Sequence, residues 1–176
     1  GAIRFVPEWW GCPHAVGKQS ISVPDDFFGI NIASAPDAAC DDYVLSCLDE
    51  LGIQAVRLTL SPDALSVQGF RRIARPLAQG LDIMLCLVPA TGDAESMDVD
   101  ADVADRWREF VQTVWTRCNG KVSGIEIGST TNRRRWSGFN YERYRRAWQI
   151  AREVCVAGKT LLAGPNVSDF EPFHNV

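Results

Sequence analysis

The sequence predicts an α/β fold built from about five parallel βα units. Short apolar segments with strand character alternate along the chain with longer segments of helical periodicity, as in successive βαβ units. One apolar segment, residues 81–88, is an almost unbroken apolar run, which is typical of a parallel strand covered on both faces. The 176 residues, with 46% hydrophobic content, suit one ordinary domain.

Each expected strand is a run of apolar residues that a helical segment or a turn follows. The five strands are expected at residues 28–32, 55–60, 81–88, 122–127 and 160–163. Two architectures join such units, a doubly wound open sheet and a TIM barrel, and periodicity does not choose between them. The absence of a Gly-x-Gly-x-x-Gly motif and of a phosphate loop weakens the nucleotide-binding version of the first.

Four helices are expected between these strands. The first spans residues 36–51 and stops at Gly52, and the second centres on residues 70–77, where Pro76 should kink or shorten it. The fourth starts near Tyr141 with Asn140 as its N-cap. The third helix has the strongest periodicity, and its apolar stripe predicts a core helix: Val103, Trp107, Phe110, Val111, Val114 and Trp115.

Carboxylates are dense just before and within the start of the third helix. They are Asp93, Glu95, Asp98, Asp100, Asp102 and Asp105. The glycine and terminal glutamate of an EF-hand loop are absent, so we favour a solvated loop with carboxylates near a helix N-terminus over a calcium site.

Composition and cysteine spacing exclude several classes of function. The formal net charge of -4 and the lack of a long apolar run suggest neither nucleic acid nor a membrane as partner. The six cysteines have no zinc-site spacing: Cys12, Cys40, Cys47, Cys86, Cys118 and Cys155. With only His14 and His174 as histidines, we expect no metal and no cofactor, and we expect reduced thiols packed as small hydrophobes in a cytoplasmic protein.

Four strand ends, taken in order, resemble one known family. They are Gly29-Ile30-Asn31, Val56-Arg57, residues 126–132 and Gly164-Pro165. In this order they look like the strand ends of clan A glycoside hydrolases, which are TIM barrels. The passage from the helix at residues 41–51 to Arg57 is similar to the helix and Gly-x-x-x-Val-Arg segment of that clan. The resemblance implies a partial (β/α)8 barrel over residues 28–176, after an N-terminal extension at residues 1–27.

The catalytic motif of that family is altered in this chain. Its fourth strand typically ends in Asn-Glu-Pro, whose Glu is the general acid and then the general base, whereas this chain reads Ser129-Thr130-Thr131. A threonine hydroxyl does not titrate near neutral pH, so Thr130 cannot donate and recover a proton. The nucleophile of the clan ends the seventh strand, beyond the five expected here. We therefore expect a fragment, or a half-barrel completed by a second copy or another chain.

Ligand groups of a TIM barrel lie at the carboxyl ends of its strands. The candidate residues are Asn31, Arg57, Glu126, Asn132, Arg133, Arg135, Trp136 and Asn166, with the loop that begins at Pro89. For Glu126 we favour a buried, hydrogen-bonded structural role over catalysis, because an unpaired interior carboxylate is costly. For Arg57 two interpretations stay open: the resemblance implies a residue of the sugar pocket, and the alternative is an ion pair, with Glu126 among the possible partners.

Arg133 to Trp136 follow the altered motif. Guanidinium groups bind anions and an exposed tryptophan stacks on sugars, so an anionic saccharide is one expected ligand. A solvated charge run with Trp136 packed on the rim is the interpretation we favour. Likewise Trp9 and Trp10 fit a plug at the barrel bottom better than a sugar platform.

Three functions remain in competition at this point. The first is a glycoside hydrolase-like domain that binds or processes a polysaccharide or its precursor and is inactive as this segment. The second is a pseudoglycosidase module for saccharide recognition or protein assembly, and the third is another α/β enzyme acting on small molecules.

Overall fold

The computed structural model describes residues 29–32, 38–65, 67–156 and 158–167. Several sequence features lie outside these ranges. They are the expected N-terminal extension at residues 1–27, with Trp9, Trp10, Cys12 and His14, and also His174.

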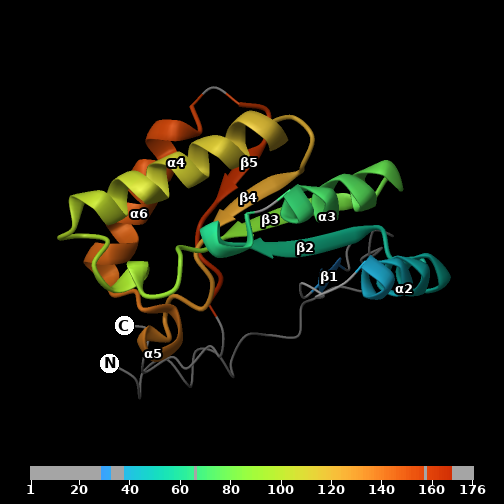
Figure 1. The fold of residues 1–176 in the computed structure, drawn as a ribbon, viewed down its shortest axis with the longest axis horizontal. Coiled ribbons are helices and arrows are strands. Elements are labelled where there is room, and N and C mark those ends of the chain that lie inside the picture. The colour runs from blue at the N-terminus through green and yellow to red at the C-terminus, as the bar shows by residue number, and fades with distance from the viewer. Residues whose placement is uncertain (1–28, 33–37, 66, 157, 168–176) are drawn as a thin grey trace, which may run out of the picture.

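The described strands form one parallel sheet. They are β1 (Gly29–Ile32), β2 (Ala55–Leu60), β3 (Asp82–Leu87), β4 (Gly124–Ile127) and β5 (Leu161–Ala163). The strand order is β1-β2-β3-β4-β5, and each strand is parallel to the next (Figure 1). This order confirms the prediction of five consecutive parallel strands and differs from a doubly wound order, in which the first strand lies inside the sheet. Closure into a barrel stays a prediction.

The helices alternate with the strands as expected, with small differences at their ends. They are α2 (Ala38–Glu50), α3 (Val67–Ala78), α4 (Ala101–Cys118), α5 (Arg134–Ser137) and α6 (Tyr141–Val154), with the 3-10 turns η1 (Pro62–Ala64) and η2 (Asp93–Glu95). The helix α3 continues for two residues past Pro76 and ends at Ala78. Pro76 lies in the last helical turn, where its missing N–H removes only one of the final backbone hydrogen bonds. The short helix α5 was not predicted.

The sheet has two chemically different faces, because successive side chains of a strand point to opposite sides. One face is aliphatic and carries Val56, Leu58, Leu60, Ile83, Leu85, Leu87, Ile125 and Ile127, all buried. The helices α2, α3, α4 and α6 supply most of the rest of this core, and Figure 1 shows α3, α4 and α6 on one side of the sheet. The other face carries Asn31, Arg57, Thr59, Met84, Cys86 and Glu126. Asn31, Arg57 and Glu126 therefore lie on the face opposite these helices.

The helix α4 forms the core helix that its periodicity predicts. All six residues of the predicted stripe are buried, and the Trp107 indole N–H donates to the carbonyl of Ala147 in α6 at 3.0 Å. The predicted N-cap of α6 is confirmed, because the Asn140 side chain accepts a hydrogen bond from the backbone N–H of Arg143 at 2.9 Å. These contacts fix α4 and α6 against each other, and α6 against β4.

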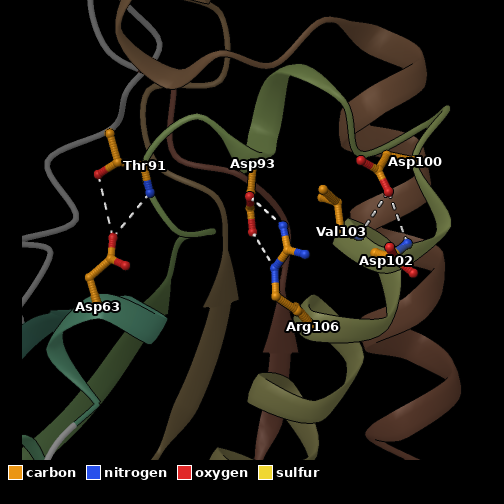
Figure 2. Close-up of polar contacts among 7 residues, drawn as sticks. All are labelled: Asp63, Thr91, Asp93, Asp100, Asp102, Val103 and Arg106. Atoms are coloured by element: carbon orange, nitrogen blue, oxygen red, sulfur yellow. Dashed lines mark hydrogen bonds and ion pairs between the residues drawn. The ribbon is translucent and has the colours of Figure 1, made fainter.

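The acidic residues before α4 have structural partners. Asp100 caps α4 by accepting from the backbone N–H groups of Asp102 and Val103, and Asp93 is ion-paired with Arg106 at 2.8 Å (Figure 2). These contacts agree with the favoured interpretation of carboxylates near a helix N-terminus. Among the described residues, no group of three or more His, Cys, Asp or Glu side chains is placed to hold a metal ion. None of the described helices has the length and apolar character needed to cross a membrane.

Candidate functional site

Asn31, Arg57 and Glu126 meet on the polar face of the sheet, where Asn31 and Glu126 lie near the carboxyl ends of β1 and β4 and Arg57 lies in the middle of β2. The Arg57 Nε donates to Glu126 Oε2 at 2.7 Å, and Arg57 Nη1 donates to Asn31 Oδ1 at 3.2 Å. The Glu126 side chain is only 7% exposed, against 19% for Arg57, while Asn31 is exposed. Of the two interpretations of Arg57, the ion pair with Glu126 is present, and Glu126 is buried and hydrogen-bonded as expected.

The arrangement of small and flexible side chains lets Arg57 reach across β3. In the register, Arg57 stands beside Met84, which stands beside Gly124, while Glu126 lies further along β4 beside Cys86. A Cβ atom at Gly124 would lie 3.3 Å from the Met84 Cε, so the absent side chain leaves room for the Met84 methyl group. The Arg57 guanidinium can therefore span from β2 to β4 over this strand.

Two atoms of this ion pair and one atom of Tyr144 are buried and make no hydrogen bond within the described part of the chain. They are Arg57 Nη2, Glu126 Oε1 and the hydroxyl oxygen of Tyr144. A buried polar atom without a partner costs about 1–3 kcal/mol, and such atoms are rare in folded proteins. The donor Nη2, the acceptor Oε1 and a hydroxyl that can do both together match the hydrogen-bonding capacity of a bound hydroxyl group or water.

Tyr144 joins this group from α6. Its ring packs edge-on against Phe139, with centroids 5.7 Å apart, and stacks near Trp148. Burial, followed by the negative charge of Glu126, raises the pKa of the Tyr144 phenol far above its ordinary value. Tyr144 is therefore a neutral hydroxyl at any physiological pH, available as a hydrogen-bond donor or acceptor.

The pKa of Arg57 reflects the same surroundings. Burial is the largest single influence and lowers the pKa of Arg57, but the hydrogen bond to Glu126 and the charges of Cys86 and Glu126 together outweigh it, so the net shift is upward. Arg57 is therefore charged in its contact with Glu126.

Cys86 lies beside Glu126 in the register, fully buried, and its thiol lies 3.7 Å from the carbonyl oxygen of Gly128. Burial raises its pKa to about 11, so the thiol is protonated and unreactive at neutral pH. Cys118 is buried as well, Cys47 and Cys155 are half-buried, and Cys40 is exposed; all five are free thiols. The expectation of reduced thiols packed as small hydrophobes is thus confirmed most clearly at Cys86 and Cys118.

The turn after β4 is tightly built. Gly128 has φ of 80°, and a Cβ atom there would lie 2.8 Å from Thr131 Cγ2 and 3.2 Å from the Tyr144 ring, so this position requires glycine. Thr130 has φ of 49°, a left-handed conformation that is uncommon for a side chain branched at Cβ. The backbone N–H of Thr131 donates to the Asn166 carbonyl at 3.4 Å, which joins this turn to the end of β5.

A groove lies between the loops that follow β3 and β4, and we call it the rim groove. Its lining includes Pro89, Thr91, Gly92, Glu95, Ser129, Thr130, Arg135, Trp136 and Phe139. Trp136 is 78% exposed, which contradicts the favoured interpretation that it packs on the rim. Since Ser129 also lies beside the Cys86 thiol, the groove begins close to the Glu126 cluster.

The structure thus separates the sequence-predicted residues into two sets. Asn31, Arg57 and Glu126 form the inner cluster, while Thr130, Arg135 and Trp136 line the rim groove. Asn132 and Arg133 are exposed on the turn between the sets, and Asn166 contributes a backbone carbonyl.

Two residues near the inner cluster are absent from the predicted site. They are Tyr144 of α6, and Cys86, which is expected from the sequence only as a packed thiol. The alternation along β3 puts Cys86 and Met84 on one face, which was the available signal for Cys86. A scan against models of known protein families found no match to this chain, and a search of curated proteins found no relative.

Proposed function

We propose that this protein is a saccharide-binding domain that resembles glycoside hydrolases but does not hydrolyse its ligand. One observation carries the proposal: the Arg57–Glu126 pair keeps a buried donor and a buried acceptor without partners within the described residues, and the Tyr144 hydroxyl, which the Glu126 charge influences, is buried and unpartnered as well. Neighbouring hydroxyls of a sugar donate to one such atom and accept from another, so a saccharide satisfies all three at once. The exposed Asn31 marks the open side of the cluster.

Hydrolysis would need a group that donates a proton to the glycosidic oxygen. Thr130, at the altered acid position, does not titrate, and the Glu126 carboxyl group is engaged by Arg57 at 2.7 Å. We therefore expect no turnover of aryl glycosides by this chain at any pH. Turnover that disappears in a Glu126→Gln variant would instead support the processing alternative, with Glu126 as the proton donor.

Calorimetric titration with neutral tetrasaccharides of glucose, xylose, mannose and galactose tests the proposal. Arg57→Lys keeps the positive charge beside Glu126 but removes the planar array of N–H donors, so we expect at least one saccharide to bind and this variant to lose about 10-fold in affinity. Arg108→Lys is the matched control, because Arg108 forms a 2.7 Å ion pair with Glu153 on the exposed surface. No binding by the folded protein, or equal losses in both variants, would overturn the proposal.

A further inference from the structure

The walls of the rim groove are held in place by hydrogen bonds and ion pairs on both sides. On one side, Thr91 donates its backbone N–H and its hydroxyl to Asp63 Oδ2 at 3.1 and 3.4 Å, and Arg106 holds Asp93 (Figure 2). Figure 2 shows these contacts tying the loop after β3 to η1 and to α4. Because the loop is fixed before any ligand arrives, ordering it costs little on binding.

The opposite wall is fixed to the first by close packing. A Cβ atom at Gly138 would lie 3.0 Å from Ala94 Cβ and 3.2 Å from Glu95 Cγ, so the turn after α5 touches η2 directly. The Arg143 guanidinium donates to the Gly138 carbonyl at 3.3 Å and lies 3.4 Å from Asp98. The two loops therefore form one braced frame around the rim groove.

Three side chains of this frame are available to a ligand. Trp136 presents an indole that is 78% exposed, and Arg135 and Glu95 line the same groove. Neither charged side chain forms an ion pair with another described residue. The exposed tryptophan can stack on a sugar ring, and the guanidinium and carboxylate beside it can bond the polar groups of that ring.

We propose that the rim groove binds an acidic sugar residue of the saccharide chain. In this site the sugar ring stacks on Trp136, its carboxylate accepts hydrogen bonds from Arg135, and a ring hydroxyl donates to Glu95. The proposal rests on the proposed function only in taking the ligand to be a saccharide; the groove shares no side chain with the Arg57 cluster.

The charged residues of the groove lining are Arg135 and Glu95. The Arg135 guanidinium can bind a carboxylate through two N–H groups, which favours an acidic over a neutral ligand. Glu95 restricts the orientation of that ligand by repelling its carboxylate towards Arg135.

The test compares oligomers of galacturonate, glucuronate and mannuronate with their own methyl esters, which keep the rings and lose the charge. We expect one acid to bind about 10-fold more tightly than its ester, and this preference to weaken in added salt. Arg135→Ala should abolish the preference, whereas Arg134→Ala, which removes the same charge from the same helix but from outside the groove lining, should largely retain it. Glu95→Gln should raise the affinity for the acid and leave the ester unchanged.

Trp136→Ala should weaken acid and ester alike, because stacking does not depend on charge, with Tyr141→Ala as the control for an aromatic residue of similar exposure. Equal binding of every acid and its ester, or equal effects of Arg134→Ala and Arg135→Ala, overturns this inference. The Arg57→Lys variant tests the proposed function separately. If Arg57→Lys weakens saccharide binding while the variants of Arg135 and Trp136 do not, the proposed function is supported and this inference about the rim groove is overturned.

Discussion

Tyr144→Phe gives a sharp test of whether the inner cluster is built for a ligand. The substitution removes a single oxygen atom that is buried and, within the described residues, has no hydrogen-bond partner, while the ring contacts with Phe139 and Trp148 stay. A tyrosine whose hydroxyl served the fold would lose stability when the oxygen is deleted. Here the desolvation cost of the hydroxyl disappears and no bond is lost.

The expected magnitude follows from that cost. An unsatisfied buried hydroxyl costs about 1–3 kcal/mol, and partial relaxation around the Phe ring should leave a gain near the lower limit, about 1 kcal/mol in the free energy of unfolding. For a chain of this size, that gain raises the midpoint of thermal unfolding by roughly 2–4 °C. In the same variant, the loss of one neutral hydrogen bond should weaken saccharide binding by about 5-fold.

Urea unfolding and calorimetric titration of the same preparations measure both effects. The reasoning predicts opposite signs, with higher stability and lower affinity. A Phe variant that is less stable by 1 kcal/mol or more would mean that the hydroxyl has a structural partner such as an ordered water, and unchanged affinity would remove Tyr144 from the site.

Two further predictions concern the fold around the site. Gly128→Ala should destabilise the protein by about 2–4 kcal/mol, because it adds a clash with Thr131 and the Tyr144 ring to the strain of positive φ. The matched control is Gly120→Ala, at φ of 76° with nothing within 4 Å of its Cβ, which should cost only about 1 kcal/mol. Equal losses of stability in urea unfolding would contradict the packing argument. Burial raises the pKa of Cys86 from 9.0 to about 11, so the folded state keeps a proton that the unfolded state releases. The contribution of this thiol to the free energy of unfolding should therefore be fully present below about pH 9 and fall by on the order of 2 kcal/mol as the pH rises to about 11, and a Cys86→Ala variant whose stability fell just as steeply would rule out this thiol as the cause.

The sequence predicted the elements of the fold closely and the site only in part. β2 lies at its predicted residues because its apolar run is bounded by turn residues at both ends. The pairing of Arg57 with Glu126 depends on the register across β3. Arg57 is level with Gly124 of β4, and Glu126 lies further along that strand. Alternation along a strand shows which face a side chain takes, but not how far along the neighbouring strand it lands.

Tyr144 and Trp136 show the same limit for helices and turns. The helical stripe places Tyr144 inward, yet the direction of its hydroxyl depends on the missing side chain at Gly128. Trp136 was expected to be packed because large aromatics usually are, and its exposure follows from the short helix α5, which local sequence did not reveal.

The position of Asn31 on β1 has a consequence for how binding can be detected. β3 is paired on both sides and contains four residues that are 0% exposed, so its amide protons should exchange with solvent most slowly. β1 is four residues long and, among the described strands, pairs with β2 alone, so its amides should exchange early. A ligand held by both Asn31 and Arg57 would fasten this outer strand to the slow-exchanging centre. Occupancy of the site should therefore be visible as slowed deuterium uptake in β1, even for a saccharide that has no chromophore and is never turned over.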